Sequence, residues 1–134
     1  MPREARIELA AIKPAPRSRH DQSPSSIRRM LAAEKSRFLA VLPPGCVRIA
    51  LDERGKQLTT ADLARKLTAW MQVGRDVAFM IGSADGLDRE LQTSADLVLC
   101  LSAMTLPHAL VRVLLAEQLY RAMSMIRNHP YHRE

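Results

Sequence analysis

Hydrophobic residues recur along the chain with two different spacings, and the two spacings alternate from one end to the other. Short runs that are almost entirely apolar occupy residues 46–51, 77–81 and 97–101. Such runs are typical of parallel strands that are covered on both faces. Residues 7–12 alternate weakly between apolar and polar side chains, and we expect a further short strand there.

Between these runs, apolar residues recur every three or four positions, which is the spacing of one face of a helix. Ser23 and Thr60 are expected to cap the first two helices, and Gly74 is expected to end the second. The sequence predicts helices over residues 24–42, 60–73, 87–95 and 106–127.

A strand followed by a helix therefore occurs four times in succession. This order is typical of an α/β fold in which a mostly parallel sheet carries helices on both faces. A chain of 134 residues is long enough to bury one core. We therefore expect a single domain spanning residues 1–134.

The composition adds a class of partner to this picture. The formal net charge is +6 and the isoelectric point is near 10, a balance that favours a polyanion such as RNA. An ordinary basic protein is the alternative. Aromatic residues make up 4% of the chain, which argues against a broad platform for stacking bases. Contacts to the nucleic-acid backbone should then carry most of the affinity.

Four arginines near the start of the chain are the candidate electrostatic footprint for RNA. Arg17 and Arg19 lie in a stretch rich in proline and serine, which is typical of an exposed loop. Arg28 and Arg29 lie on the predicted helix that follows. A solvated helix face is the alternative interpretation of this charge.

The two cysteines and the apolar runs bear on the cellular compartment. Cys46 and Cys100 both lie within apolar runs, so buried free thiols are expected rather than a disulfide or a catalytic cysteine. The N-terminus has no apolar signal core, and no apolar run reaches the length of a membrane span. These features predict a cytoplasmic protein with no membrane partner.

Three predicted turns follow the ends of predicted strands, at residues 52–56, 82–86 and 102–107. In a parallel sheet these turns gather at one edge, where α/β proteins bind ligands. Gly82 and Gly86 would let a ligand approach the backbone, although a tight strand-to-helix turn is the more ordinary interpretation of this pair. The turn lacks the lysine and hydroxyl residue of a P-loop. No spacing resembles a zinc site, so no metal is expected.

The last predicted helix and the residues after it are unusual. Arg112 is the only polar residue between positions 110 and 115, so more than one helix face needs covering. A domain of this size buries one face, which favours a subunit interface; a central core helix is the alternative. Residues 128–134 follow, and a frayed terminus is one interpretation of them. Their density of acid–base groups favours a functional tail that includes Tyr131, His132 and Arg133.

The sequence resembles the RNA large subunit methyltransferase H family, a group of SPOUT-class enzymes. The resemblance covers nearly the whole chain and is strongest in four blocks: SAMTLPH at 102–108, LVRVL at 110–114, EQLYRA at 117–122 and NHPYHRE at 128–134. It implies a C-terminal trefoil knot, bound S-adenosylmethionine, and methylation of N3 of a pseudouridine in 23S ribosomal RNA. It also implies a homodimer that acts on the assembled ribosome.

The resemblance also implies roles for particular residues. Tyr131 and His132 would frame the target base and assist loss of its proton, and Arg133 would hold a phosphate or the cofactor carboxylate. RNA would be bound by Arg17, Arg19, Arg28, Arg29 and Arg121. The cofactor would be bound by Leu51, Gly82, Ser83, Ser102, Ala103, Met104, Thr105, Leu106 and Pro107.

The sequence departs from the family pattern in two places. The turn that usually reads Gly–Gly–Pro–Glu–Gly is Gly–Ser–Ala–Asp–Gly here, at residues 82–86, so Ser83 replaces a glycine. Family members also begin with one more strand and helix, so we expect this chain to be short at its N-terminus. Two alternatives follow: an RNA- or ribosome-binding relative with impaired catalysis, or a SPOUT methyltransferase with another RNA target.

Overall fold

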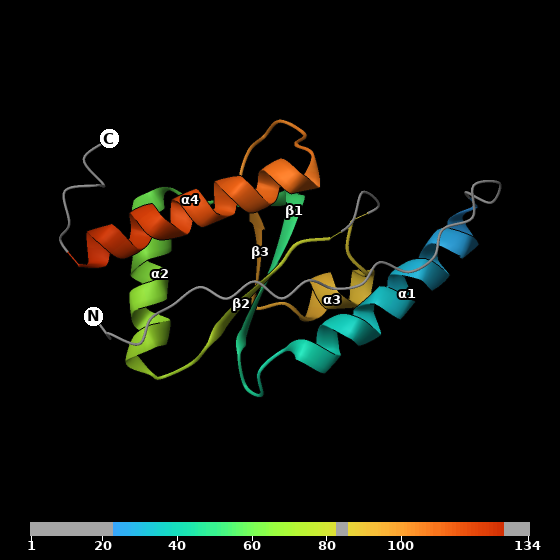
Figure 1. Ribbon diagram of the computed structural model, residues 1–134, viewed down its shortest axis with the longest axis horizontal. Helices are drawn as coiled ribbons and strands as arrows, with labels where there is room; N and C mark the ends of the chain where they lie inside the picture. The colour runs from blue at the N-terminus through green and yellow to red at the C-terminus, as the bar shows by residue number, and fades with distance from the viewer. Residues whose placement is uncertain (1–22, 83–85, 128–134) are drawn as a thin grey trace.

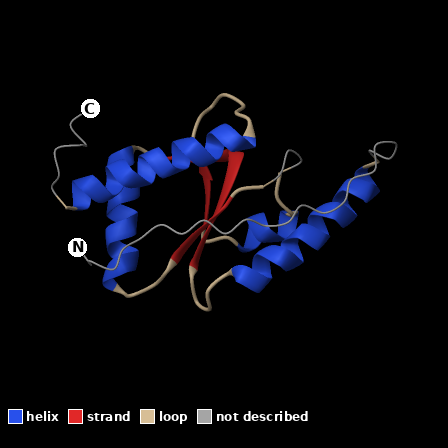
Figure 2. Ribbon diagram, in the orientation of Figure 1, coloured by secondary structure: helices blue, strands red, loops and turns tan. Residues whose placement is uncertain are grey.

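The computed structural model describes residues 23–82 and 86–127 of the chain. Within these residues, three parallel strands form a central sheet with helices on both sides (Figures 1 and 2). The strands are β1 (Val47–Gln57), β2 (Val77–Met80) and β3 (Leu97–Cys100), in the order β2-β1-β3. The helices are α1 (Pro24–Val41), α2 (Thr60–Gln72), α3 (Arg89–Ser94) and α4 (His108–Ile126). The predicted strand at residues 7–12 lies outside the described part of the chain.

The two faces of the sheet carry different helices, because consecutive residues of a strand point to opposite sides. Leu51 and Phe79 pack on the side of α2 and α4. Ala50 and Met80 pack on the other side, in a cluster with residues of α1 and α3. Figure 1 shows these helix pairs on either side of the strands. The predicted α/β class, with a parallel sheet covered on both faces, is therefore confirmed.

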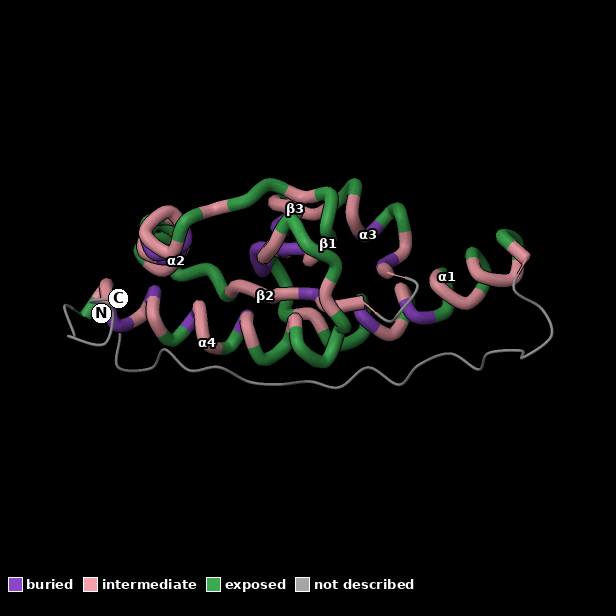
Figure 3. The backbone as a smooth tube through the Cα atoms, turned by 90° about the horizontal axis from the view of Figure 1, so that it is seen from above, coloured by how far each residue is buried: buried purple, intermediate pink, exposed green. Residues whose placement is uncertain are grey.

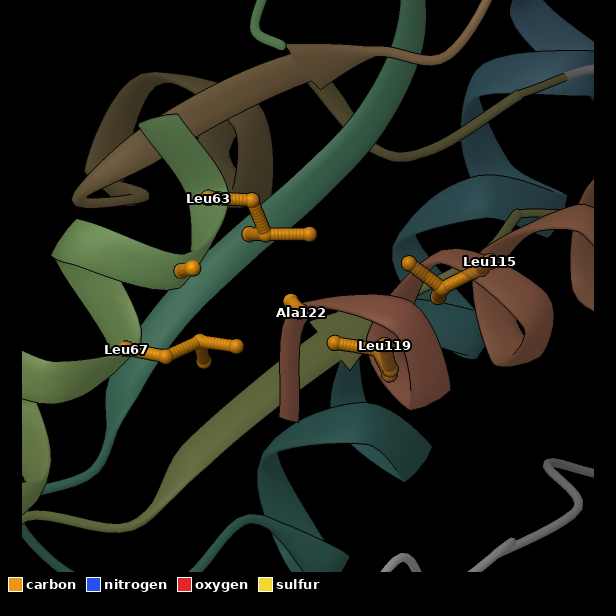
Figure 4. Packing of buried hydrophobic residues seen from close by; sticks show 6 residues of the cluster. Leu63, Leu67, Leu115, Leu119 and Ala122 are labelled. Carbon is orange, nitrogen blue, oxygen red and sulfur yellow. The ribbon is translucent and has the colours of Figure 1, made fainter. Parts of the chain in front are cut away.

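A core cluster between α2 and α4 fixes the position of the last helix. Leu63 and Leu67 of α2 point toward Leu115, Leu119 and Ala122 of α4 (Figure 4). Each of these leucines is at most 8% exposed, and full burial of one such side chain contributes about 1.5–3 kcal/mol. This packing holds the axis of α4 across one face of the sheet.

Polar contacts add to both helix layers. The Thr60 hydroxyl of α2 donates a hydrogen bond of 2.5 Å to the Gln118 amide oxygen of α4. On the other face, the Lys35 ammonium of α1 lies 2.7 Å from the Glu90 carboxylate of α3. Both contacts join segments that are far apart in sequence, so they fix the helices relative to one another.

The helix ends follow local sequence signals with one shift from the prediction. Ser23 caps α1 as predicted, and its hydroxyl accepts a hydrogen bond from the Ser26 N–H. Thr59, rather than Thr60, caps α2. The reason is a capping box: Thr59 and Asp62 each accept a hydrogen bond from the other's backbone N–H. Gly74 follows α2 with a φ of 74°, as expected for a glycine that ends a helix.

Strand β1 is longer than the sequence predicts. Residues 52–56 were expected to form a loop, but they belong to the strand, which continues to Gln57. The register breaks there, because Leu99 of β3 is the partner of both Leu51 and Lys56. Gly55 makes this possible: a Cβ atom at Gly55 would lie 2.7 Å from the carbonyl carbon and oxygen of Val98. The missing side chain lets β1 return to β3 after the charged residues.

The predicted free thiols are present, and both are buried. Cys46 lies just before β1 and Cys100 ends β3. Among residues 23–82 and 86–127, no helix is both long enough and apolar enough to cross a bilayer.

Candidate functional site

A cleft of about 750 Å³ opens where β2 and β3 end, beside residues 51–54 of β1. The chain passes from β1 to β2 on one side of β1 and then to β3 on the other. Ligands of open α/β sheets bind at such a switch in strand order. The cleft is lined by Leu51, Asp52, Glu53, Arg54, Ile81, Gly82, Gly86, Leu99, Leu101, Ser102, Met104, Thr105, Leu106, Pro107, His108 and Val111.

The wall that follows β2 is formed by two glycines in contact. A Cβ atom at Gly82 would lie 2.4 Å from the carbonyl oxygen of Gly86, a separation that real side chains do not reach. Gly86 has a φ of 87°, a conformation that favours glycine. The backbone itself therefore forms this part of the cleft, as the sequence predicts for the pair.

The wall that follows β3 is a loop that enters α4. The Cys100 thiol donates to the carbonyl oxygen of Ser102 at 2.7 Å, and the Ser102 hydroxyl accepts a hydrogen bond of 3.0 Å from the Met104 N–H. Pro107 precedes α4 and makes no side-chain cap hydrogen bond. The first N–H groups of a helix have no partner within it, and they give this end a positive partial charge. The start of α4 therefore favours an anionic group in the cleft.

Residues 52–54 of β1 bring charge to the cleft. The Asp52 carboxylate, with a side chain 12% exposed, accepts hydrogen bonds from the Arg54 N–H at 2.8 Å and from Arg54 Nε at 3.1 Å. Burial raises the pKa of the Asp52 carboxyl, but the hydrogen bonds from Arg54 outweigh burial and bring the pKa below its ordinary value. Asp52 is therefore ionised at neutral pH.

A side-chain hydrogen bond joins β1 to the wall that follows β3. The Thr105 hydroxyl donates to the Glu53 carboxylate at 3.0 Å. Both residues line the cleft and both are exposed. The two walls are thereby connected across 52 residues of sequence.

Most residues predicted to bind a cofactor gather in this cleft. They are Leu51, Gly82, Ser102, Met104, Thr105, Leu106 and Pro107. Ala103 is exposed and is not part of the cleft lining, and Ser83 lies outside the described residues. The residues predicted to bind the cofactor did not include Asp52, Glu53 or Arg54, although the sequence placed residues 52–56 in a turn at the end of a strand. They also did not include His108, which follows the predicted turn at residues 102–107. Gly86, which was expected to let a ligand approach the backbone, lines the cleft.

Three of the residues predicted to bind RNA are among the described residues, and these three lie away from the cleft lining. Arg28 and Arg29 are exposed in the first half of α1. Arg121 lies in the second half of α4, where its Nε is 2.6 Å from the Glu117 carboxylate. Thirteen residues separate Arg121 from His108 at the cleft, or about 20 Å along the helix. Arg17, Arg19, Tyr131, His132 and Arg133 lie outside the described residues.

Helix α4 exposes an apolar strip on the side that does not face α2. Leu110 is 43% exposed, Val113 is 62% exposed and Tyr120 is 55% exposed. Figure 3 shows exposed and buried positions alternating along this helix. Within the described residues, one face of α4 is therefore covered and another is open, as its apolar composition predicts.

These features define a class: a small α/β protein with a ligand cleft at the switch point of a parallel sheet. A family model described as "Predicted SPOUT methyltransferase" matches residues 1–132 of the chain. The chain belongs to the SPOUT methyltransferase family.

Curated relatives agree with this assignment. The chain is 57% identical over 133 residues to a protein of Nitrosospira multiformis, and the match covers 99% of this chain and 83% of the relative. It is 58% identical over 133 residues to proteins of Burkholderia ambifaria and Burkholderia vietnamiensis, with the same coverage. All three relatives are named "Ribosomal RNA large subunit methyltransferase H".

Proposed function

We propose that the cleft binds S-adenosylmethionine and that the protein transfers its methyl group to N3 of a pseudouridine in large-subunit (23S) ribosomal RNA. One observation carries this proposal: seven of the residues that the family resemblance assigns to the cofactor line a single cleft. The relatives' name supports large-subunit ribosomal RNA as the substrate. The pseudouridine N3 position follows from the family resemblance of the four sequence blocks.

The cleft fits the shape and charge of this methyl donor. Its volume of about 750 Å³ falls within the range of about 300–1,000 Å³ that is usual for small-molecule sites. Leu51 and Leu101 offer apolar surface for a purine ring, and the carboxylates of Asp52 and Glu53 suit a ligand that carries a positive sulfonium. The first turn of α4 suits the carboxylate of the donor's amino-acid part.

The chemistry divides between the donor and the protein. When bound, S-adenosylmethionine supplies an activated methyl group on its sulfonium. The protein holds this group in line with the ring nitrogen of the target base, because displacement requires the two atoms to be close and aligned. The proton on N3 must also leave. Tyr131 and His132 are the proposed groups that frame the base and assist proton loss, and Arg133 and Arg121 are proposed to hold a phosphate or carboxylate.

We propose that the active protein is a homodimer. The exposed apolar strip formed by Leu110, Val113 and Tyr120 supports this arrangement, because burial against a second copy would remove it from water. Along α4, Arg121 is about 15 Å from Val111 and about 20 Å from His108, the two α4 residues that line the cleft of its own chain. In a dimer, the tail and Arg121 of one chain would serve the cleft of the other.

The same family resemblance supports two further expectations. The three walls of the cleft would belong to a C-terminal trefoil knot, which holds the turns together by threading. The substrate would be the assembled ribosome in the cytoplasm, with Arg17, Arg19, Arg28 and Arg29 supplying sequence-independent contacts to RNA phosphates. The net charge of +6 supports this electrostatic contribution.

The test combines donor binding with methyl transfer. Purified full-length protein is titrated with S-adenosylmethionine by calorimetry, and is then incubated with ribosomes from a strain that lacks the modification. Nucleosides from the 23S RNA are analysed by mass spectrometry. The proposal predicts donor binding and the appearance of 3-methylpseudouridine. Binding without this product would point to another RNA target, and absence of binding would point to a relative with impaired catalysis; either result contradicts the proposal.

A further inference from the structure

The hydrogen bond between Glu53 and Thr105 joins two cleft walls that come from different strands. The Thr105 hydroxyl lies 3.0 Å from the Glu53 carboxylate. We propose that Glu53 is a positioning residue, which holds the middle of the loop at residues 102–107 in the conformation that receives the methyl donor. The identity of the ligand in this inference rests on the proposed function. The hydrogen bond between Glu53 and Thr105 is observed in the protein without a ligand.

The segment that carries Glu53 is fixed on both sides. Before it, Asp52 accepts two hydrogen bonds from Arg54, and these hold the residues on either side of Glu53 together. After it, Gly55 lies directly against the backbone of Val98, and pairing with β3 resumes at Lys56. Glu53 therefore extends from a segment that is anchored to the sheet.

The loop that carries Thr105 has fewer contacts of its own. Hydrogen bonds at its beginning involve Ser102, which contacts Cys100 and the Met104 N–H. At its end, Pro107 leads into α4. The middle of the loop is exposed, and the Met104 side chain is 75% exposed. The bond from Thr105 to Glu53 is a hydrogen bond that ties this middle part to another element.

A contact of this kind acts by ordering the loop before the ligand arrives. Fixing backbone residues costs conformational entropy, and a loop that is already ordered does not pay this cost when it binds. The alternative role for a carboxylate here is direct attraction of a cationic ligand. The two roles differ in their dependence on Thr105, because only loop ordering requires its hydroxyl.

The experiment uses substitutions on both partners in the full-length protein. Glu53→Ala and Thr105→Val each remove the hydrogen bond, the double variant removes both groups, and Thr105→Ser keeps the hydroxyl. Glu90→Gln and Thr93→Val on α3 are matched controls, since neither residue lines the cleft. Calorimetry gives the affinity for S-adenosylmethionine. Amide hydrogen exchange of residues 103–107 in the ligand-free protein gives the order of the loop.

The proposal predicts a specific pattern of effects. Each single substitution weakens affinity about threefold to tenfold, as expected for the loss of one partly exposed hydrogen bond to a charged group. The double variant is no weaker than the single variants, and Thr105→Ser binds like the unchanged protein. Hydrogen exchange at residues 103–107 becomes faster in both single variants without ligand.

Three results would overturn the proposal. Additive losses in the double variant would mean that the two residues act independently. A loss of affinity in Glu53→Ala with none in Thr105→Val would mean that the carboxylate acts on the ligand by charge. Unchanged hydrogen exchange would mean that the contact does not order the loop. If the unchanged protein binds no S-adenosylmethionine, the proposed function fails, whereas the exchange experiment still decides whether Glu53 orders the loop.

Discussion

Gly82 and Gly86 approach so closely that a Cβ atom on Gly82 would lie 2.4 Å from the Gly86 carbonyl oxygen. The contact brings the end of β2 against the start of the segment that leads to α3. It forms one wall of the cleft from backbone alone. Any side chain at Gly82 must therefore move backbone atoms at the site, rather than displace a flexible neighbour.

Gly82→Ala should accordingly impair the cleft. We expect its affinity for S-adenosylmethionine to fall by about tenfold or more, because small displacements of binding groups have large effects. Gly74→Ala is the matched control. Gly74 has a φ of 74°, and the space around its Cβ position is open. The Gly74→Ala protein should therefore lose about 1 kcal/mol of stability and keep its affinity for S-adenosylmethionine. Calorimetry and chemical denaturation measure the two effects, and equal affinities in both variants would contradict the role of Gly82.

The apolar strip on α4 predicts how association depends on sequence. Val113→Glu places a charge in the centre of the strip and should convert a dimer into a monomer, since an unpaired charge is costly to bury. Val73→Glu is the control, because Val73 is 69% exposed at the end of α2 and lies outside the strip. Sedimentation velocity measures the mass of each variant. A Val113→Glu protein that remains dimeric would show that the interface lies elsewhere.

Arg28 and Arg29 are predicted to contribute electrostatically to RNA binding. Replacing both with alanine should lower the slope of log K against log salt by about 1.5, because each lost phosphate contact removes about 0.7–0.9 from it. The control is the pair Arg65→Ala and Lys66→Ala on α2, which lies on the opposite face of the sheet from α1. The slope is measured with labelled ribosomal RNA over a salt series. If the α1 variant keeps the original slope, these arginines do not contact phosphates.

The hydrogen bonds between Asp52 and Arg54 predict that the stability of the fold depends on pH. Burial raises the pKa of Asp52, but the hydrogen bonds from Arg54 lower this pKa by more than burial raises it. The pKa in the folded protein therefore lies below its value in the unfolded chain. Ionised Asp52 therefore stabilises the fold at neutral pH, and this contribution is lost as pH falls below the ordinary carboxyl range of about 4 and through the folded pKa.

Arg54→Ala removes the guanidinium, whose hydrogen bond and charge lower this pKa, and leaves the backbone N–H of residue 54 and the opposing effect of burial. The carboxyl of Asp52 should then titrate at higher pH, and its contribution to stability should be lost earlier on acidification. Arg65→Ala, which removes a partner of Asp62 instead, should leave the titration of Asp52 unchanged. Carbon-13 NMR of the carboxyl group measures both variants. An unchanged titration midpoint in Arg54→Ala would refute the proposed balance.

Much of the fold could be predicted because apolar spacing depends on which faces of an element are covered. The continuous apolar runs of β1, β2 and β3 reflect a sheet with helices on both sides. The cap of α2 was misplaced by one residue, because Thr59 and Thr60 are both suitable caps. The carboxylate of Asp62, three residues after Thr59, decides between them.

The site was predictable in outline and not in its contacts. Parallel strands bring their following turns to one edge, so the gathering of residues 82 and 102–107 follows from strand order alone. The extension of β1 was missed because residues 52–56 are mostly charged, which is typical of a loop. Its cause is a tertiary contact, the approach of Gly55 to Val98. The bond from Glu53 to Thr105 likewise joins residues 52 apart, and no local pattern indicates it.

Mapping the bound methyl donor on the protein tests the central claim most directly. Amide hydrogen exchange is measured on the full-length protein with and without S-adenosylmethionine, with S-adenosylhomocysteine as a second ligand that lacks the methyl group. The account predicts protection of residues 51–54, 81–82, 101–102 and 104–106, which line the three walls of the cleft. Protection confined to other segments, or no protection at saturating donor, would contradict it.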